Sequence, residues 1–147
     1  MMNIMNVNPE IISAYLFYAT VVTLKTMAMT FATAYQRITK KIFSNPEDAA
    51  MNNGKIDLNN ESVERVRRAH LNDMETIFPF LFLGAAYCTT GPSTFVAINL
   101  FRIFTLARIV HSIVYLFQMP QPSRFLAFLV SILCNIFMAM VIFFHYL

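Results

Sequence analysis

The chain has 147 residues, of which 57% are hydrophobic and 13% charged, against about 45–50% and about 25% in an ordinary soluble domain. This composition excludes a disordered chain, and the presence of only two cysteines excludes a small domain held by several disulfides. A formal net charge of +3 is too small to indicate a nucleic-acid partner, so we expect one integral membrane domain over residues 1–147.

The charged side chains are concentrated in one stretch of the chain. Of the 19 Asp, Glu, Lys and Arg residues, 14 lie between Arg37 and Glu75. Four mostly apolar segments, at about 11–36, 65–90, 94–118 and 123–146, are long enough for the roughly 20 residues that a spanning helix needs. We therefore predict an all-α membrane protein, a four-transmembrane-helix bundle with helices at about 11–41, 62–90, 94–118 and 123–146.

The first helix is expected to be retained rather than cleaved as a signal peptide, because no basic residue precedes it and its apolar run is too long. A polar connection over about 42–61 follows, with turn residues at Asn45–Asp48 and at Asn52–Gly54. Short breaks at Thr89–Ser93 and Met119–Pro122 separate the remaining helices. Because these two connections are short, the helices that they join must run antiparallel.

The distribution of basic residues predicts the orientation in the membrane. The connections at 42–61 and 119–123 share one side of a four-helix protein, and that side carries nearly all of the Lys and Arg residues that flank the helices. The other side holds both termini and the turn at Gly91-Pro92. Basic loops face the cytosol, so we expect a cytosolic loop at about 42–61 and lumenal termini.

Several ionisable and polar residues stand inside the predicted helices, where they are costly in lipid and are typical of functional sites. Arg68, Asn72 and Glu75 have helical spacing and share one face, as do Arg108, His111 and Tyr115. Arg37 ends the first helix and Arg124 begins the fourth. With the predicted orientation, all of these side chains fall in the cytosolic half of the membrane.

Each of these groups also has a structural interpretation. Arg68, Asn72 and Glu75 are compatible with a network that joins helices, and Arg108 with His111 is compatible with a pairing to Asp73 or Glu75. Lys25 stands alone in a run of 26 residues from Ile11 to Gln36, which favours a structural polar contact over a site residue.

As a binding site, four arginines with one carboxylate and one amide favour an anion that also carries an amine, since arginine pairs with carboxylates and Glu75 is able to hold an ammonium group. No spacing of Cys, His and carboxylates indicates a metal site, and no glycine-rich phosphate loop is present.

At these residues the sequence resembles the MAPEG family, the membrane-associated proteins of eicosanoid and glutathione metabolism. The segments that carry the resemblance are Asn45–Asp48, Val63–Gly84, Ala107–Tyr115 and Gln121–Arg124. Within the family the chain is similar to the type 1 branch of microsomal glutathione transferases. Leu71, Phe125 and Phe128 stand where the pattern of the prostaglandin E synthase branch has arginine, serine and tyrosine. Ala49 stands where vertebrate type 1 transferases carry a cysteine linked to activation, so thiol-triggered activation is not expected.

The resemblance implies a homotrimer in the membrane of the endoplasmic reticulum, with the outer mitochondrial membrane as a further location and with glutathione as co-substrate bound between subunits on the cytosolic side. It places Arg124 as the catalytic residue that stabilises the thiolate. The glutathione-binding positions that it implies are Arg37, Arg68, His70, Asn72, Glu75, Arg108 and Tyr115.

The expected activity is conjugation of the glutathione thiolate to hydrophobic electrophiles that reach the site from the lipid bilayer, together with glutathione-dependent reduction of lipid hydroperoxides. Two alternatives remain open at this point. One is a glutathione-dependent isomerase of the prostaglandin E synthase type, and the other is a non-catalytic membrane scaffold.

Overall fold

The computed structural model describes residues 7–147. The long helices are α1 (Pro9–Lys40), α3 (Glu61–Cys88), α4 (Thr94–Leu116) and α5 (Gln121–Tyr146). The connection between α1 and α3 holds a short helix, α2 (Pro46–Met51), and two short strands, β1 (Ile42–Phe43) and β2 (Lys55–Ile56). The long helices begin and end within two residues of the predicted bounds. Residues 1–6, which belong to the predicted lumenal end, lie outside the described residues.

Polar residues and prolines set the starts of the helices. The side-chain oxygen of Asn8 accepts a hydrogen bond from the backbone N–H of Glu10 at 2.9 Å, and Pro9 opens α1. Asn60 accepts in the same way from the N–H of Val63 at 3.4 Å at the start of α3. Such contacts satisfy backbone groups that have no partner inside the first turn. These caps therefore fix where α1 and α3 begin.

The connection between α1 and α3 is more ordered than the turns that the sequence predicted. Strands β1 and β2 pair in parallel, with Ile42 opposite Lys55 and Phe43 opposite Ile56, and both residues of β1 are buried. Strands of two residues are too short for a periodic pattern, which explains why the sequence analysis missed them. The pairing closes the connection into a compact cap over the ends of α1 and α3.

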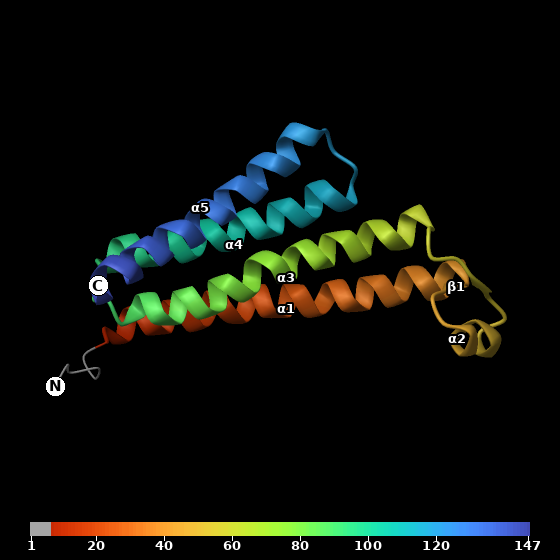
Figure 1. The fold of residues 1–147 in the computed structure, drawn as a ribbon, viewed down its shortest axis with the longest axis horizontal. Coiled ribbons are helices and arrows are strands. Elements are labelled where there is room, and N and C mark those ends of the chain that lie inside the picture. Colours follow the sequence, from red (N-terminus) through yellow and green to blue (C-terminus); the bar gives the residue numbers. More distant parts are fainter. Residues whose placement is uncertain (1–6) are drawn as a thin grey trace.

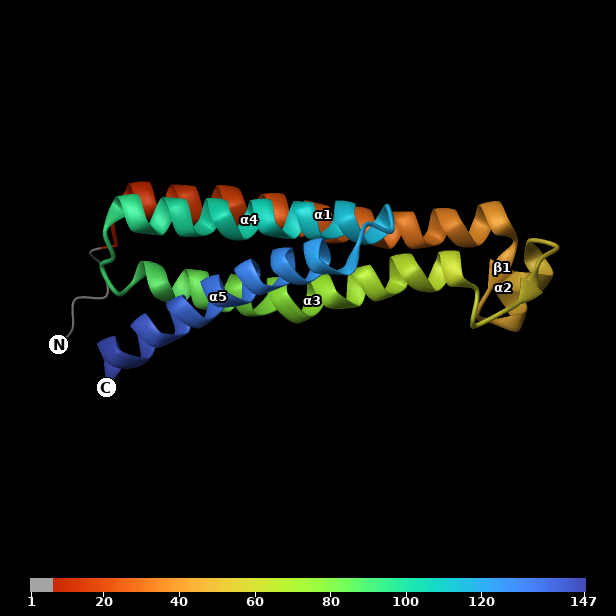
Figure 2. The same cartoon turned by 90° about the horizontal axis from the view of Figure 1, so that it is seen from above.

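The long helices form two hairpins that pack against each other (Figures 1 and 2). One hairpin is α1 with α3 and the other is α4 with α5, and α1 lies on α4 while α3 lies on α5. Figure 1 shows that α1 and α3 extend beyond the turn between α4 and α5, so the first hairpin projects at that end. The start of α1, the end of α5 and the turn between α3 and α4 lie together at the opposite end.

Three of these helices, α1, α4 and α5, are long and apolar enough to cross a membrane. Helix α3 has 28 residues, but its first 15, residues 61–75, hold seven of the 19 charged side chains of the chain. This charge lowers its apolarity relative to the other three, although it packs between α1 and α5 for much of its length. The described chain is thus a helical membrane protein whose polar helix is α3.

The half of the bundle near the α3–α4 turn has an aromatic core. The rings of Phe80 and Phe104 stack with centroids 4.0 Å apart, and Phe101 meets Phe80 edge-on at 6.0 Å. All three side chains are fully buried. At Gly84 a Cβ atom would stand 2.6 Å from the ring of Tyr15, so the close approach of α1 and α3 requires glycine there.

Pro79 interrupts the hydrogen bonding of α3, because proline has no N–H to donate. Side chains from both neighbouring helices bond to backbone carbonyls in this region. The Asn135 amide of α5 donates to the carbonyl of Thr76 at 2.9 Å, and the Tyr15 hydroxyl of α1 donates to the carbonyl of Leu81 at 2.6 Å. These two bonds tie α5 and α1 to the stretch of α3 around the proline.

Candidate functional site

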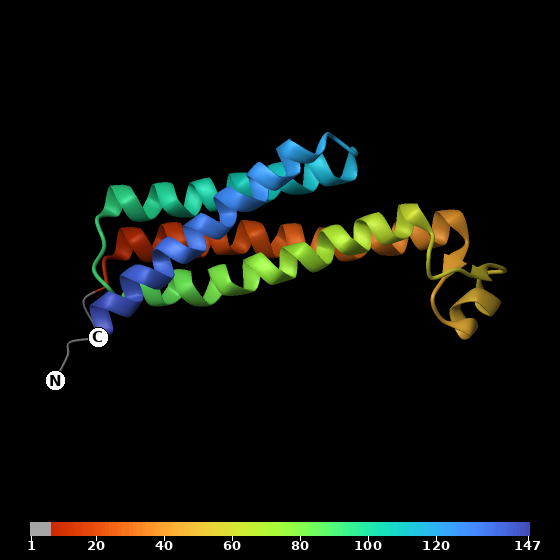
Figure 3. The ribbon, with the colours of Figure 1, turned by 45° about the horizontal axis from the view of Figure 1, so that its top comes forward.

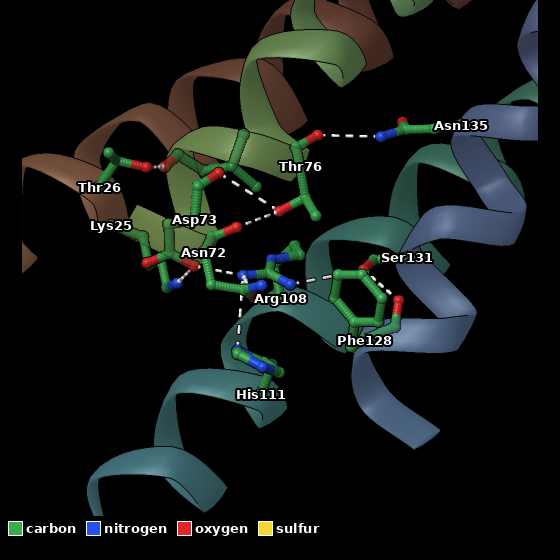
Figure 4. A network of polar contacts seen from close by, with 11 residues as sticks. Lys25, Thr26, Asn72, Asp73, Thr76, Arg108, His111, Phe128, Ser131 and Asn135 are labelled. Atoms are coloured by element: carbon green, nitrogen blue, oxygen red, sulfur yellow. Dashed lines mark hydrogen bonds and ion pairs between the residues drawn. The ribbon is translucent and has the colours of Figure 1, made fainter. Parts of the chain in front are cut away.

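A network of charged and polar side chains crosses the bundle just beyond the aromatic core (Figure 4). Asp73 of α3 is its centre and is fully buried. Its Oδ1 atom accepts from the Nη2 atom of Arg108 at 2.6 Å and also pairs with the Lys25 ammonium of α1. Arg108 has no exposed surface either, and its Nη1 atom reaches the Ser131 hydroxyl of α5 at 3.5 Å. All four long helices therefore contribute to one polar layer.

This network confirms two of the structural interpretations. The pairing of Arg108 with Asp73, one of the two partners considered, is present, and Lys25 makes the polar contact that its isolation suggested. Of the group expected to join helices, Asn72 does so, because its side-chain oxygen accepts from Nη2 of Arg108 on α4 at 3.0 Å. Arg68 instead binds the Glu61 carboxylate at 3.1 Å, and Glu75 is exposed.

A hollow of about 210 Å³ opens next to the network, between α3 and the α4–α5 hairpin. Figure 3 shows α5 diverging from α3 towards this end of the bundle. Asn72, His111 and Tyr115 line the hollow from α3 and α4, and Arg124 lines it from the first turn of α5. The remaining lining residues are Gln121, Phe125 and Phe128. Four of the predicted site residues thus share one cavity.

Arg124 is held at the edge of this hollow without a counter-charge. Its guanidinium lies over the ring of Tyr115, 4.7 Å from the ring centroid, and its Nη2 atom donates to the Gln121 side-chain oxygen at 2.6 Å. Among residues 7–147 no carboxylate lies within ion-pair distance of it, whereas Arg65, Arg67, Arg68 and Arg108 each pair with one. The positive charge of Arg124 is therefore open to an anion in the hollow.

The other predicted site residues lie outside this hollow in the single protomer. Arg37, on the last turn of α1, bonds to the Ser44 hydroxyl and lines a different cavity of about 280 Å³ with Arg67 and Asp57. Arg68 and Glu75 are exposed on α3, and His70 is half-buried there. Arg108 lies behind the hollow rather than in its lining.

Sequence reasoning did not place Asp73, Phe125 or Phe128 in the site. Asp73 was considered only as a partner of Arg108, because a lone carboxylate in a charged stretch has no distinctive spacing. Phe128 lies four residues after Arg124 and three after Phe125, and this helical spacing was the signal available for placing Phe128 near both of them on α5.

The sequence analysis assigned no role to Arg102, which is a charged residue of α4. Arg102 is exposed, and it donates to the Tyr18 hydroxyl at 3.1 Å and to the Asn99 side chain at 3.2 Å. In the part of the chain that the structure describes, no group of three or more His, Cys, Asp or Glu residues is placed to hold a metal ion.

Comparison with known proteins gives consistent matches over most of the chain. Microsomal glutathione S-transferase 1 of Mus musculus is 51% identical over 127 residues, which are 83% of this chain and 82% of the relative. The protein of the same name from Homo sapiens is 47% identical over the same shares. Prostaglandin E synthase of Equus caballus is 43% identical over 126 residues, 85% of this chain and 82% of the relative.

The matches to both kinds of relative are long, and the glutathione transferase sequences are the more similar of those compared here. A family model describes residues 15–144, which include every residue of the polar network and of the hollow. The chain belongs to the MAPEG family.

Proposed function

We propose that the protein is a membrane glutathione transferase, in which the hollow beside Arg124 holds the reacting sulfur of glutathione. The observation that carries the proposal is the unpaired guanidinium of Arg124 at a cavity whose wall also holds Asn72, His111 and Tyr115. The similarity to microsomal glutathione S-transferase 1 over more than four-fifths of the chain supports glutathione as the ligand.

The chemical task of the site is to ionise a thiol. A free cysteine thiol has a pKa of about 8.5, so at neutral pH most of the glutathione is protonated. Lowering that pKa by two would require about 2.7 kcal/mol of preferential binding of the thiolate. A permanently charged guanidinium without a competing carboxylate, in a site partly shielded from water, supplies an interaction of that size.

The thiolate then attacks the electrophilic carbon of the second substrate directly, with loss of that substrate's leaving group or with addition across its double bond. No covalent bond to the protein is needed. Phe125 and Phe128 give the hollow an apolar wall next to Arg124, which suits electrophiles that dissolve in the bilayer. The same thiolate accounts for reduction of lipid hydroperoxides, with a second glutathione completing the disulfide.

We further propose that the functional unit is a homotrimer of four-spanning subunits. Arg37 and Arg124 line different cavities within one protomer, and Arg68 and Glu75 present their polar groups on the outer surface of α3. A neighbouring subunit that covers this surface would bring its Arg37 to the glutathione peptide. Glu75 has no ion pair among residues 7–147 and is available to the glutathione ammonium group.

An isomerase acting on a lipid endoperoxide is the second candidate, favoured by the 43% identity to the horse prostaglandin E synthase. It would use the same thiolate. Leu71, Phe125 and Phe128 weigh against it, because each replaces a polar residue of that branch's pattern.

The decisive experiment is a conjugation assay on the purified protein with glutathione and a generic aromatic electrophile, comparing the natural chain with Arg124→Leu. We expect the variant to lose turnover by about 100-fold or more, with a smaller loss of glutathione affinity, because the lost interaction acts on the thiolate. The ultraviolet absorbance of bound thiolate should disappear with it. Arg124→Lys should restore part of the rate, since a point charge replaces a planar fork.

Raising the pH through about 8.5 should return part of the Arg124→Leu rate, because solvent then removes the thiol proton. Near-normal turnover of Arg124→Leu at neutral pH would refute the assigned role. Equal losses of glutathione affinity and of rate would show that Arg124 binds a carboxylate of glutathione. The Tyr115 hydroxyl would then be the candidate group that stabilises the thiolate. A chain that turns over a lipid endoperoxide but no electrophile would establish the isomerase instead, and the absence of both activities would favour a scaffold.

A further inference from the structure

The back wall of the hollow is organised by a single nitrogen atom. Nη2 of Arg108 lies 2.6 Å from Oδ1 of Asp73, 3.0 Å from Oδ1 of Asn72 and 3.4 Å from Nδ1 of His111 (Figure 4). Asn72 and His111 both line the hollow, while Arg108 and Asp73 have no exposed surface behind them. A fully buried ion pair therefore contacts two residues of the cavity wall from the side away from the cavity.

The two N–H groups of Nη2 only donate, so the Asp73 and Asn72 oxygens, at 2.6 and 3.0 Å, accept from them. The more distant Nδ1 of His111, at 3.4 Å, bonds to the same nitrogen only as an acceptor that shares one of these N–H groups. For Asn72 this fixes the amide orientation, with its oxygen turned to Arg108 and its NH₂ group left for the hollow. For His111 it requires a lone pair on Nδ1. The neutral ring then carries its proton on Nε2, which is the other polar atom of this side chain.

The contacts with Arg108 therefore make Asn72 and His111, each of which is otherwise able to donate or to accept, donors towards the hollow. An asparagine is able to present oxygen or nitrogen, and a histidine either tautomer. With the NH₂ group of Asn72, the Nε2–H group of His111 and the guanidinium of Arg124, three donors from α3, α4 and α5 border the same cavity. A cavity with this polarity favours an anionic atom over a neutral or cationic one.

We propose that Asp73 is a positioning residue of the site: by anchoring Arg108 it fixes Asn72 and His111 as donors to the hollow. Lys25 is its second cation and holds the carboxylate from the α1 side. His111 consequently donates to the sulfur anion and does not take the proton of the thiol. The identity of the anion rests on the proposed function, but the hydrogen-bond directions rest on the network alone.

The charges around His111 come from every packed helix and agree with a neutral ring. Lys25 on α1, Arg108 on α4 and Arg124 on α5 are cations, and Asp73 on α3 is the carboxylate. A proton on Nδ1 would point at Nη2 of Arg108, and a ring protonated on both nitrogens would add a fourth positive charge to these three cations. Both effects oppose it.

The direct test is the tautomer of His111, measured by NMR on protein with ¹⁵N-labelled histidine. The chain has three histidines, so the His111 signals are identified by their absence in His111→Phe. We expect one neutral species with a bare Nδ1 and a protonated Nε2. A proton on Nδ1, or an even mixture of the two tautomers, would overturn the proposal without reference to any enzyme activity.

The role of Asp73 is tested by Asp73→Asn, which keeps the size of the side chain and removes its charge. We expect a mixture of His111 tautomers and a fall in kcat of about tenfold, the loss that follows from one misdirected hydrogen bond to a charged group. The absorbance of bound thiolate should fall in the same proportion. Glu61→Gln is the matched control, because it removes the carboxylate of the exposed Arg68 pair and should leave the His111 spectrum unchanged.

A double variant separates positioning from simple charge balance. Lys25→Met with Asp73→Asn removes one cation and one anion, so the net charge of the network is unchanged, but Arg108 still lacks its anchor. If Asp73 acts by positioning Arg108, the mixture of His111 tautomers and the lower kcat should persist in this variant. Recovery of both to natural values would show that only the charge count matters and would overturn the proposal.

The outcomes also distinguish this inference from the proposed function. A single Nε2–H tautomer that is lost in Asp73→Asn, in a chain that conjugates no electrophile, would leave the positioning inference standing and refute the transferase. Normal conjugation by the natural chain with an unchanged His111 spectrum in Asp73→Asn would do the reverse. Should Asp73→Asn fail to fold, the His111 spectrum of the natural chain still tests the hydrogen-bond directions.

Discussion

The two halves of the bundle are built from the same four helices but use opposite chemistry. Near the α3–α4 turn, Phe80, Phe101 and Phe104 fill the interior with stacked and edge-on rings. Towards the α4–α5 turn the interior holds Asp73 and Arg108, and a hollow lies beside them where α5 diverges from α3. The interior of the first half is mainly aromatic and apolar, whereas the interior of the second half contains a buried ion pair.

The difference shows how a small membrane protein keeps a polar site in place. Buried ion pairs are costly to assemble and gain little net stability, so the polar half is a poor anchor for the fold. Close packing of aromatic rings is a better one, since each ring buries a large apolar area. We infer that the aromatic half stabilises the bundle while the polar half is free to serve the ligand.

The largest expected effect concerns which side of the membrane each half faces. Cysteine in place of Asn53, in the connection near the polar half, should react fully with an impermeant thiol reagent in sealed microsomes, and cysteine in place of Ser93 should not react. The basic residues on the first side are the reason. The natural Cys88 and Cys134 are buried and set the background. Opening the vesicles with detergent should allow both sites to react, and the reverse pattern in sealed vesicles would contradict the orientation.

Removing a ring from the aromatic half should mainly cost stability. Phe80→Ala is expected to lower the free energy of unfolding by about 3–5 kcal/mol, the usual cost of a large cavity in a packed core. Denaturant titration in mixed micelles measures this loss. Phe82→Ala is the control on the same helix, because Phe82 is 77% exposed. The fraction of Phe80→Ala that remains folded should keep its KM for glutathione, and a raised KM would mean that the two halves are not independent.

A change in the polar half should affect the ligand and spare the fold. Glu75→Gln should weaken glutathione binding about tenfold, as expected for one lost hydrogen bond between charged groups. Calorimetric binding with a check of the oligomeric state measures it. Glu64→Gln, which touches only the Arg67 pair, serves as the comparison variant. Loss of the oligomer in Glu75→Gln would show that Glu75 holds subunits together rather than ligand.

The smallest expected effect lies at the apolar wall of the hollow. Phe125→Ser should lower kcat/KM about fivefold for a hydrophobic electrophile, because part of the apolar area of a phenylalanine is lost. A small polar electrophile should be converted at nearly the natural rate. Phe143→Ser, at the far end of α5, should change neither substrate. An equal loss for both electrophiles would place Phe125 against glutathione instead.

Much of the architecture could be predicted from the sequence, because the length of an apolar segment depends only on residues that are consecutive in the chain. Prolines, glycines and asparagines mark the helix ends within two residues, and the spacing of Arg108, His111 and Tyr115 puts them on one face of α4. Asn72, His111, Tyr115 and Arg124 line one cavity, and their role as a binding site stays a prediction. The paired strands β1 and β2 could not be predicted, since each has two residues and the pairing joins positions far apart in the connection.

The sequence by itself determined that the chain is helical and membrane-bound, and it identified the polar residues that lipid makes expensive. Only the tertiary structure decided which of those charges are neutralised. Lys25 and Arg108 lie on different helices, 83 positions apart, yet both contact the same Asp73 oxygen. Spacing along one helix reveals a shared face but not the partner that this face meets. The assignment of Arg108 to the buried pair and of Arg124 to the open hollow therefore depends on how four helices pack, because electrostatic pairing acts through space.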